Sequence, residues 1–212
     1  MSQKSTFLEA LFLTILIFGI GILVGVWFES YRVSQIDALY TMSELRLLDW
    51  NIAQSALESA SCTEANTEIM NFADRIYEEA KLLDKYEGAS RLSDTIMLRH
   101  QKYDLMRVSL LHSAVNIKQR CNSNFTIVTY FYKYVEPETE TRAIQSIFSR
   151  ALSDLKAEKQ GRVLLIPIAG DIDMMSIQST VKKLNVTALP TILIDGKKIT
   201  SAEQLLNLKN LV

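Results

Sequence analysis

The first apolar run of the chain is long enough to cross a membrane. From Ala10 to Phe28 there are 19 uncharged residues, most of them aliphatic or aromatic. As a helix they would extend roughly 28 Å, close to the roughly 30 Å hydrocarbon core of a bilayer. The run is longer than the apolar region of a signal peptide, and Val26-Trp27-Phe28 is a poor cleavage site. Residues 1–28 are therefore predicted to form an uncleaved transmembrane signal anchor, with the lipid bilayer as its partner.

Residues 29–121 are predicted to be helical. The stretch from 29 to 120 contains no proline and a single glycine, Gly88. Apolar residues recur there at steps of three and four in two runs, one from Thr63 to Gly88 and one starting near Ser93 or Asp94. They predict an antiparallel helical hairpin. A third run continues directly from the membrane span as a stalk expected to pack on the hairpin: Ile36, Leu39, Met42, Leu45 and Leu48.

The only two cysteines stand at the outer ends of the two hairpin helices, at Cys62 and Cys121. Antiparallel helices of nearly equal length bring those ends together, so a disulfide between them is predicted. It would close a loop of about 60 residues and stabilise the fold by about 4 kcal/mol in the chain-entropy model. A disulfide favours an oxidising compartment. We therefore expect a cytoplasmic N-terminus and an extracytoplasmic location for the bulk of the chain.

Charge excludes one class of partner and leaves orientation open. Lysine and arginine number 23 against 24 aspartates and glutamates, a net charge of −1. Nucleic-acid-binding proteins normally carry a basic surplus or a basic face, so nucleic acid is not an expected partner. Flanking charges do not predict the orientation of the span, because positive residues flank both of its ends, with Lys4 before it and Arg32 and Arg46 after it. Asn124 and Asn185 begin Asn-x-Thr tripeptides; these are candidate glycosylation sites, although such matches also arise by chance.

Beyond residue 124 the pattern changes from helical to mixed. Residues 126–132 are rich in β-branched and aromatic side chains and predict a strand. Pro137 is expected to open the following helix at its first position, and Gly161 to end it. Further elements are predicted as a strand at 162–168, a helix at 174–184, a strand at 191–194, a turn at Asp195-Gly196 with a short strand after it, and a terminal helix from the Ser201 capping box.

This β-α-β-α-β-β-α order resembles the thioredoxin family. The segment Val186-Thr187-Ala188-Leu189-Pro190-Thr191-Ile192-Leu193-Ile194, followed by Asp195-Gly196, carries the resemblance, which covers residues 124–212. It implies a cis Pro190, with an ordinary trans proline as the alternative. It also places Pro167 in an edge strand, where proline is tolerated. The predicted fold class is α+β/α: a transmembrane helix (1–28), an antiparallel helical bundle (29–121) and a thioredoxin-like α/β domain (124–212).

The resemblance implies a site without catalytic residues. Val135-Glu136-Pro137-Glu138 stands where active members carry Cys-x-x-Cys, and Thr129 stands where they carry a buried acidic residue. The thiolate is the nucleophile of disulfide exchange, and neither valine nor glutamate can supply it. This C-terminal domain is therefore expected to be redox-inactive.

The resemblance also implies a surface that binds peptides. In the family, backbone just before the cis proline pairs with an extended peptide, as in strand addition. The candidates here are Ala188, Leu189 and Pro190, with Tyr132, Tyr134 and Val135 nearby. Packing alone is an alternative explanation of the aromatic residues, because strands commonly use them to fill a core.

No metal or cofactor is expected. His100 and His112 stand twelve positions apart, with no cysteine pair or acidic cluster at metal-ligand spacing. Ordinary surface or interhelical positions explain both histidines better than a metal site does.

Three functions stay open at this point. A membrane-anchored binding or scaffold protein, acting on a protein or extended peptide, agrees with most of these features. A thiol–disulfide oxidoreductase that uses Cys62 and Cys121 is the enzymatic alternative, weakened because the pair lacks Cys-x-x-Cys spacing. A homo-oligomeric membrane protein is the third, since Gly21 and Gly25 fit the small-xxx-small pattern of membrane helix pairs.

Overall fold

The computed structural model describes residues 3–87 and 93–199, and the chain divides into two compact units, Met1–Ala53 and Gln54–Val212. The first helix, α1 (Gln3–Ser59), runs through the first unit and just into the second. Its segment Phe7–Tyr31 has a mean hydropathy of 2.6, is not buried, and is long and apolar enough to span a membrane. The helix has no break after this segment, which confirms the stalk as its direct continuation. Packing of the stalk on the hairpin stays a prediction.

The second unit begins with the predicted helical hairpin, α2 (Cys62–Glu87) and α3 (Ser93–Cys121). A disulfide joins the first residue of α2 to the last residue of α3, with Cα atoms 5.4 Å apart, as predicted. The two helices contact each other. Their buried apolar side chains include Ala65, Ile69, Phe72, Ala73, Ile76, Tyr103, Met106, Leu110, Ala114 and Ile117. Gly88, the predicted end of the first helix, lies outside the described residues.

The start of α2 differs by a residue from the prediction near Thr63. Ser61 and Glu64 form a reciprocal capping box, in which the Ser61 amide donates to the Glu64 carboxylate and the Glu64 amide donates to Ser61 Oγ. Cys62 is consequently the first residue of the helix.

A four-stranded mixed sheet follows the hairpin. Its strands are β1 (Thr126–Tyr132), β2 (Val163–Ala169), β3 (Thr191–Ile194) and β4 (Lys197–Lys198), in the order β2-β1-β3-β4. The β1 and β2 strands are parallel, whereas β3 is antiparallel to both β1 and β4. The strand positions agree with the predicted ones. The predicted terminal helix from Ser201 lies outside the described residues.

Pro167 lies in β2, an edge strand of the described sheet, as predicted. The amide of Gly170, three residues on, donates to the Tyr132 carbonyl of β1. Amides alternate in direction along a parallel ladder, so the position of Pro167 faces away from β1. The missing N–H of this proline therefore costs the sheet no hydrogen bond.

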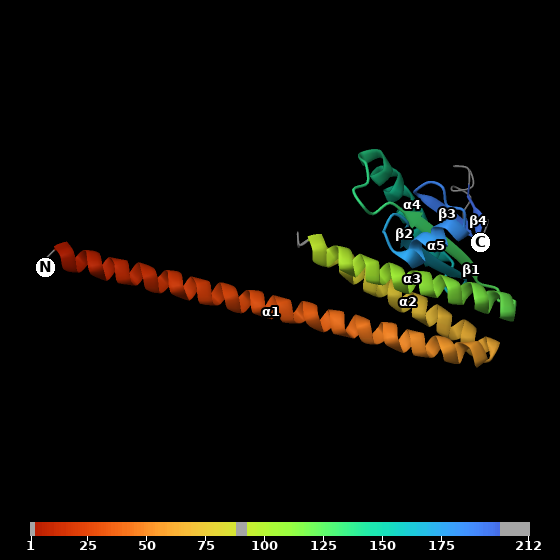
Figure 1. Ribbon diagram of the computed structural model, residues 1–212, viewed down its shortest axis with the longest axis horizontal. Coiled ribbons are helices and arrows are strands. Elements are labelled where there is room, and N and C mark those ends of the chain that lie inside the picture. Colours follow the sequence, from red (N-terminus) through yellow and green to blue (C-terminus); the bar gives the residue numbers. More distant parts are fainter. Residues whose placement is uncertain (1–2, 88–92, 200–212) are drawn as a thin grey trace. The chain divides into compact units, whose positions relative to one another are not determined.

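Helices cover both faces of this sheet (Figure 1). On one face, α4 (Thr139–Glu158) packs Leu152 and Leu155 against alternate residues of the strands, among them Val128 and Tyr130. On the other face, α3 contacts β1 and β2, and α5 (Met175–Lys183) packs on α3. The hairpin therefore shares its core with the sheet, which the sequence did not predict.

The predicted helix start at Pro137 is wrong, because α4 begins at Thr139 with Glu138 as its N-cap residue. The first backbone bond of this helix runs from the Arg142 amide to the Glu138 carbonyl, at 2.9 Å. The Pro137 carbonyl accepts instead from the Arg142 guanidinium, at 3.3 Å. The side chain of Arg142 thus takes the carbonyl that a helix opening at Pro137 would use.

Candidate functional site

The peptide-binding residues predicted from the sequence lie in loops at the carboxyl end of β1 and just before β3. The Leu189–Pro190 peptide bond is cis, which confirms the isomer that the sequence predicted. Leu189 lies over Gly170, where a Cβ would come within 2.9 Å of the Leu189 Cδ2 atom. A larger residue at position 170 would therefore displace the end of the Leu189 side chain.

The loop after β1 is held at both ends by side-chain hydrogen bonds. The Asp171 carboxylate accepts from the amides of Tyr134 and Val135, at 2.8 and 2.7 Å. The Gln145 side chain accepts from the Lys133 amide at 2.7 Å and donates to its carbonyl at 3.1 Å. Because Asp171 directly follows Gly170, this segment contacts both the Leu189 loop and the loop after β1. The structure thus brings the two halves of the candidate site together.

Side chains at this site differ in their exposure. Val135 is 42 % exposed, and Ala188 is exposed as well. Tyr132 is partly buried against the core that α4 covers, so packing explains this residue. The Tyr134 ring lies against His100 of α3, with ring centroids 3.8 Å apart and the two planes tilted by 33°. The Ala188 carbonyl accepts from Thr191 Oγ1 at 2.6 Å, so the part of the predicted set open to a partner is mainly Val135 and the backbone of Leu189.

No thiol is available at this site, because both cysteines of the chain are joined in the disulfide. Val135 and Glu136 occupy the loop, where Glu136 takes a left-handed backbone with φ of 41°. Glu138 precedes α4 and makes no side-chain cap hydrogen bond. Thr129 is buried at 3 % exposure, in the middle of β1. Carboxylates and aliphatic groups at these positions cannot attack a disulfide.

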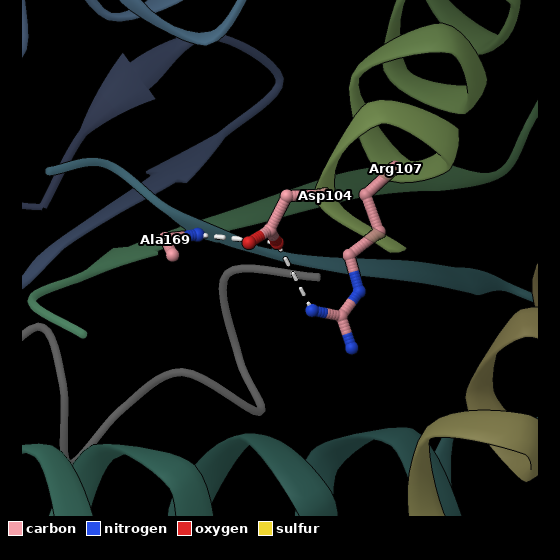
Figure 2. A network of polar contacts seen from close by, with 3 residues as sticks. All are labelled: Asp104, Arg107 and Ala169. Carbon is pink, nitrogen blue, oxygen red and sulfur yellow. Dashed lines mark hydrogen bonds and ion pairs between the residues drawn. The ribbon is translucent and has the colours of Figure 1, made fainter. Parts of the chain in front are cut away.

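A buried ion pair lies beneath the site and was not predicted (Figure 2). Asp104 Oδ1, on α3, accepts from Arg107 Nη1 at 3.1 Å and from the Ala169 amide at 3.3 Å. Asp104 is fully buried and Arg107 is 8 % exposed. Burial raises the pKa of Asp104 above its usual value, against the opposing charge of Arg107.

This ion pair positions the hairpin against the edge of the sheet. The Ala169 amide belongs to the outward series of β2, which pairs with no other strand in the described sheet. Asp104 satisfies it and so covers part of an open strand edge. Since Ala169 directly precedes Gly170 and Asp171, α3 fixes the strand end from which the site is built.

His112 lies between two helices, as predicted, with its Nε2 atom 3.4 Å from Thr180 Oγ1 of α5. His100 of α3 lies instead against Tyr134 in the loop after β1. Burial, together with the positive charge of Lys183, lowers the pKa of His112. Among the described residues, no group of three histidine, cysteine, aspartate or glutamate side chains could hold a metal ion.

Two further predictions concern the Asn-x-Thr sites and the glycine pair of the first helix. Asn124 and Asn185 are exposed, as glycosylation requires, and their modification stays a prediction. A Cβ at Gly21 or Gly25 would meet no atom within 4 Å, so these glycines are open to a partner helix, and their pairing also stays a prediction.

The position of Cys62 at the start of a helix was not predicted from the sequence. Cys62 is exposed and is the first residue of α2, where the helix dipole favours a thiolate. The local signal for this was the Ser61-x-x-Glu64 capping box immediately around it.

No protein-family model matches this chain, and no curated protein matches it. The resemblance to the thioredoxin family therefore stays a prediction.

Proposed function

We propose that this chain is a single-pass membrane-anchored binding protein that holds an extended polypeptide beside the cis Leu189–Pro190 bond. In this proposal the Phe7–Tyr31 segment crosses the bilayer, with the N-terminus in the cytoplasm. The disulfide supports an extracytoplasmic location for the remainder, because such bonds persist in oxidising compartments. The thioredoxin-like interpretation of the sheet is supported by its strand order and by the cis proline.

The observation that carries the proposal is the unpaired backbone of Leu189. Among the residues that the structure describes, neither its amide nor its carbonyl takes part in a backbone hydrogen bond. The segment leads directly into β3 and lies beside the exposed Val135 loop through Gly170 and Asp171. An extended peptide could pair with this backbone as an added strand, and its side chains could contact Val135.

Rigidity of the surrounding loops favours binding. Asp171 and Gln145 fix the backbone from Lys133 to Val135 through four hydrogen bonds. A loop that is already ordered loses little conformational entropy when a partner binds. The site therefore has the properties of a preformed binding surface without a nucleophile.

Site-specific photocrosslinking in native membranes tests this proposal. With a photoreactive amino acid in place of Ala188, we expect an adduct on an extracytoplasmic polypeptide, and the additional change Val135→Asp should weaken it severalfold. The same amino acid in place of Ser153, exposed on α4, is the matched control and should give no such adduct. Equal labelling from both positions, or labelling that is unchanged by Val135→Asp, would contradict the proposal. Adducts made only with a second copy of the chain would favour the homo-oligomeric alternative.

The exposed position of Cys62 at a helix start favours a second candidate function, thiol–disulfide exchange through Cys62 and Cys121. An attacking thiolate could reach the Cys62 sulfur, and a released Cys62 thiolate would be stabilised at the N-terminus of α2. The cysteines are nevertheless 59 positions apart and close a structural hairpin. We regard a structural role for this bond as better supported.

Insulin reduction distinguishes the two functions. We expect the purified full chain, supplied with dithiothreitol, to reduce insulin no faster than its Cys62→Ser/Cys121→Ser variant, because the bond is structural. A rate clearly above that of the variant would establish the oxidoreductase instead. Thioredoxin serves as the positive control for the assay.

A further inference from the structure

A cavity of about 590 Å³ lies on the face of the sheet that α3 and α5 cover, separate from the proposed peptide site. Leu111 of α3, Leu184 after α5 and Leu193 of β3 supply aliphatic walls from three directions. The volume lies within the range of about 300–1,000 Å³ that is usual for small-molecule sites.

Thr129 presents an unused hydroxyl on the floor of this cavity. The residue is 97 % buried and lines the cavity from the middle of β1. No hydrogen bond of its hydroxyl is found among the described residues. The hydroxyl can therefore donate to, or accept from, a polar atom of a ligand in the cavity.

The charged side chains of the lining are Lys118, Lys183 and Asp195, which give it a net charge of +1. Lys118 Nζ donates to Asp195 Oδ1 at 2.6 Å, and the same oxygen accepts from the Ile127 amide at 3.0 Å, so this pair is already satisfied. Lys183, at the end of α5, also lines the cavity and has no ion pair within the part of the chain that the structure describes. Burial lowers the pKa of His112, and the positive charge of Lys183 lowers it further.

We propose that this cavity binds a singly charged amphipathic anion, with its acidic group at Lys183 and its aliphatic chain between α3, α5 and the sheet. The net positive charge of the lining favours a ligand with one negative charge. The leucine walls favour a chain of methylenes, and Thr129 donates to or accepts from a polar atom that reaches the floor. This site is independent of the peptide-binding proposal, because its lining includes none of the residues proposed to bind the peptide.

Photoaffinity labelling of the full chain in phosphatidylcholine nanodiscs tests the proposal, with a diazirine-bearing decanoate as the probe. We expect saturable labelling of peptides from α3, α5 or β3. Unlabelled decanoate should compete, whereas acetate, which lacks the chain, and decyltrimethylammonium, which reverses the charge, should not. Labelling found only in α1, or equal competition by the cationic analogue, would overturn the proposal.

Neighbouring lysines of α5 provide a matched pair of variants. Lys183→Met should reduce labelling about tenfold, the loss expected for a charge-assisted hydrogen bond. Lys182→Met removes the same charge one residue away, from an exposed side chain that does not line the cavity, and should leave labelling unchanged. Equal losses from both variants would reduce the effect to general electrostatics and reject the site. Nanodiscs that contain phosphatidylglycerol identify the source of the anion: lost labelling indicates a lipid occupant, and unchanged labelling a free carboxylate.

Discussion

Replacing Cys62 and Cys121 together by alanine is expected to lower the free energy of unfolding of residues 54–212 by about 4 kcal/mol. The disulfide joins residues 59 positions apart. Without it, the unfolded chain regains the conformational freedom of a closed loop of about 60 residues. Because domains are commonly stable by only about 5–15 kcal/mol, the loss is large. Pulse proteolysis of the full chain in detergent micelles across a urea gradient would measure it.

Reductant provides the internal control for this prediction. Treating the natural chain with dithiothreitol should shift its urea midpoint toward that of the double variant, while the same treatment should leave the variant unchanged. The expected loss also extends to the sheet, since α3 carries the Asp104 bond to the Ala169 amide. A loss below about 1 kcal/mol would contradict the prediction and indicate that the unfolded chain is already compact in this region.

Local patterns were sufficient to predict the hairpin and its disulfide. Helical spacing of apolar residues and the position of Gly88 in the sequence predicted two helices of nearly equal length. Antiparallel helices of nearly equal length bring Cys62 and Cys121 together. The same holds for Pro167, because a missing amide can be accommodated only where a strand lacks a neighbour. These features depend on residues close in sequence or on a rule that applies to any sheet.

The contacts that build the candidate site could not be predicted from local patterns. Asp171 accepts from amides 36 and 37 positions away, and Asp104 accepts from one 65 positions away. The acceptors are ordinary carboxylates and the donors are backbone groups, which carry no side-chain signature in a sequence. Pro137 shows the opposite case. The local rule that places proline at the first position of a helix failed here, and the Arg142 guanidinium donates to the Pro137 carbonyl.

Replacing Arg107 by methionine is expected to destabilise the second unit by about 3–5 kcal/mol at pH 7. The change leaves the fully buried Asp104 carboxylate without its cation, while its bond to the Ala169 amide persists. Urea unfolding, read by pulse proteolysis, would measure the loss. The ion pair between Asp74 and Lys156 offers a control, because Asp74 is exposed. Asp74→Asn should lower the free energy of unfolding by less than about 1 kcal/mol. Similar losses of unfolding free energy from Arg107→Met and Asp74→Asn would contradict the prediction that burial of Asp104 makes its ion pair the more important one.

The pH dependence of the Arg107→Met variant has a definite sign. Burial raises the pKa of Asp104 in the folded chain, and removing the nearby positive charge raises it further. A raised folded pKa means that this group favours folding fully below its unfolded pKa, and that the contribution is lost as pH rises through the folded value. The variant should therefore regain stability on acidification from pH 7 toward pH 5 relative to the natural chain. The double change Asp104→Leu/Arg107→Met removes both charges and should abolish that difference, because no buried carboxylate is left to bind the proton.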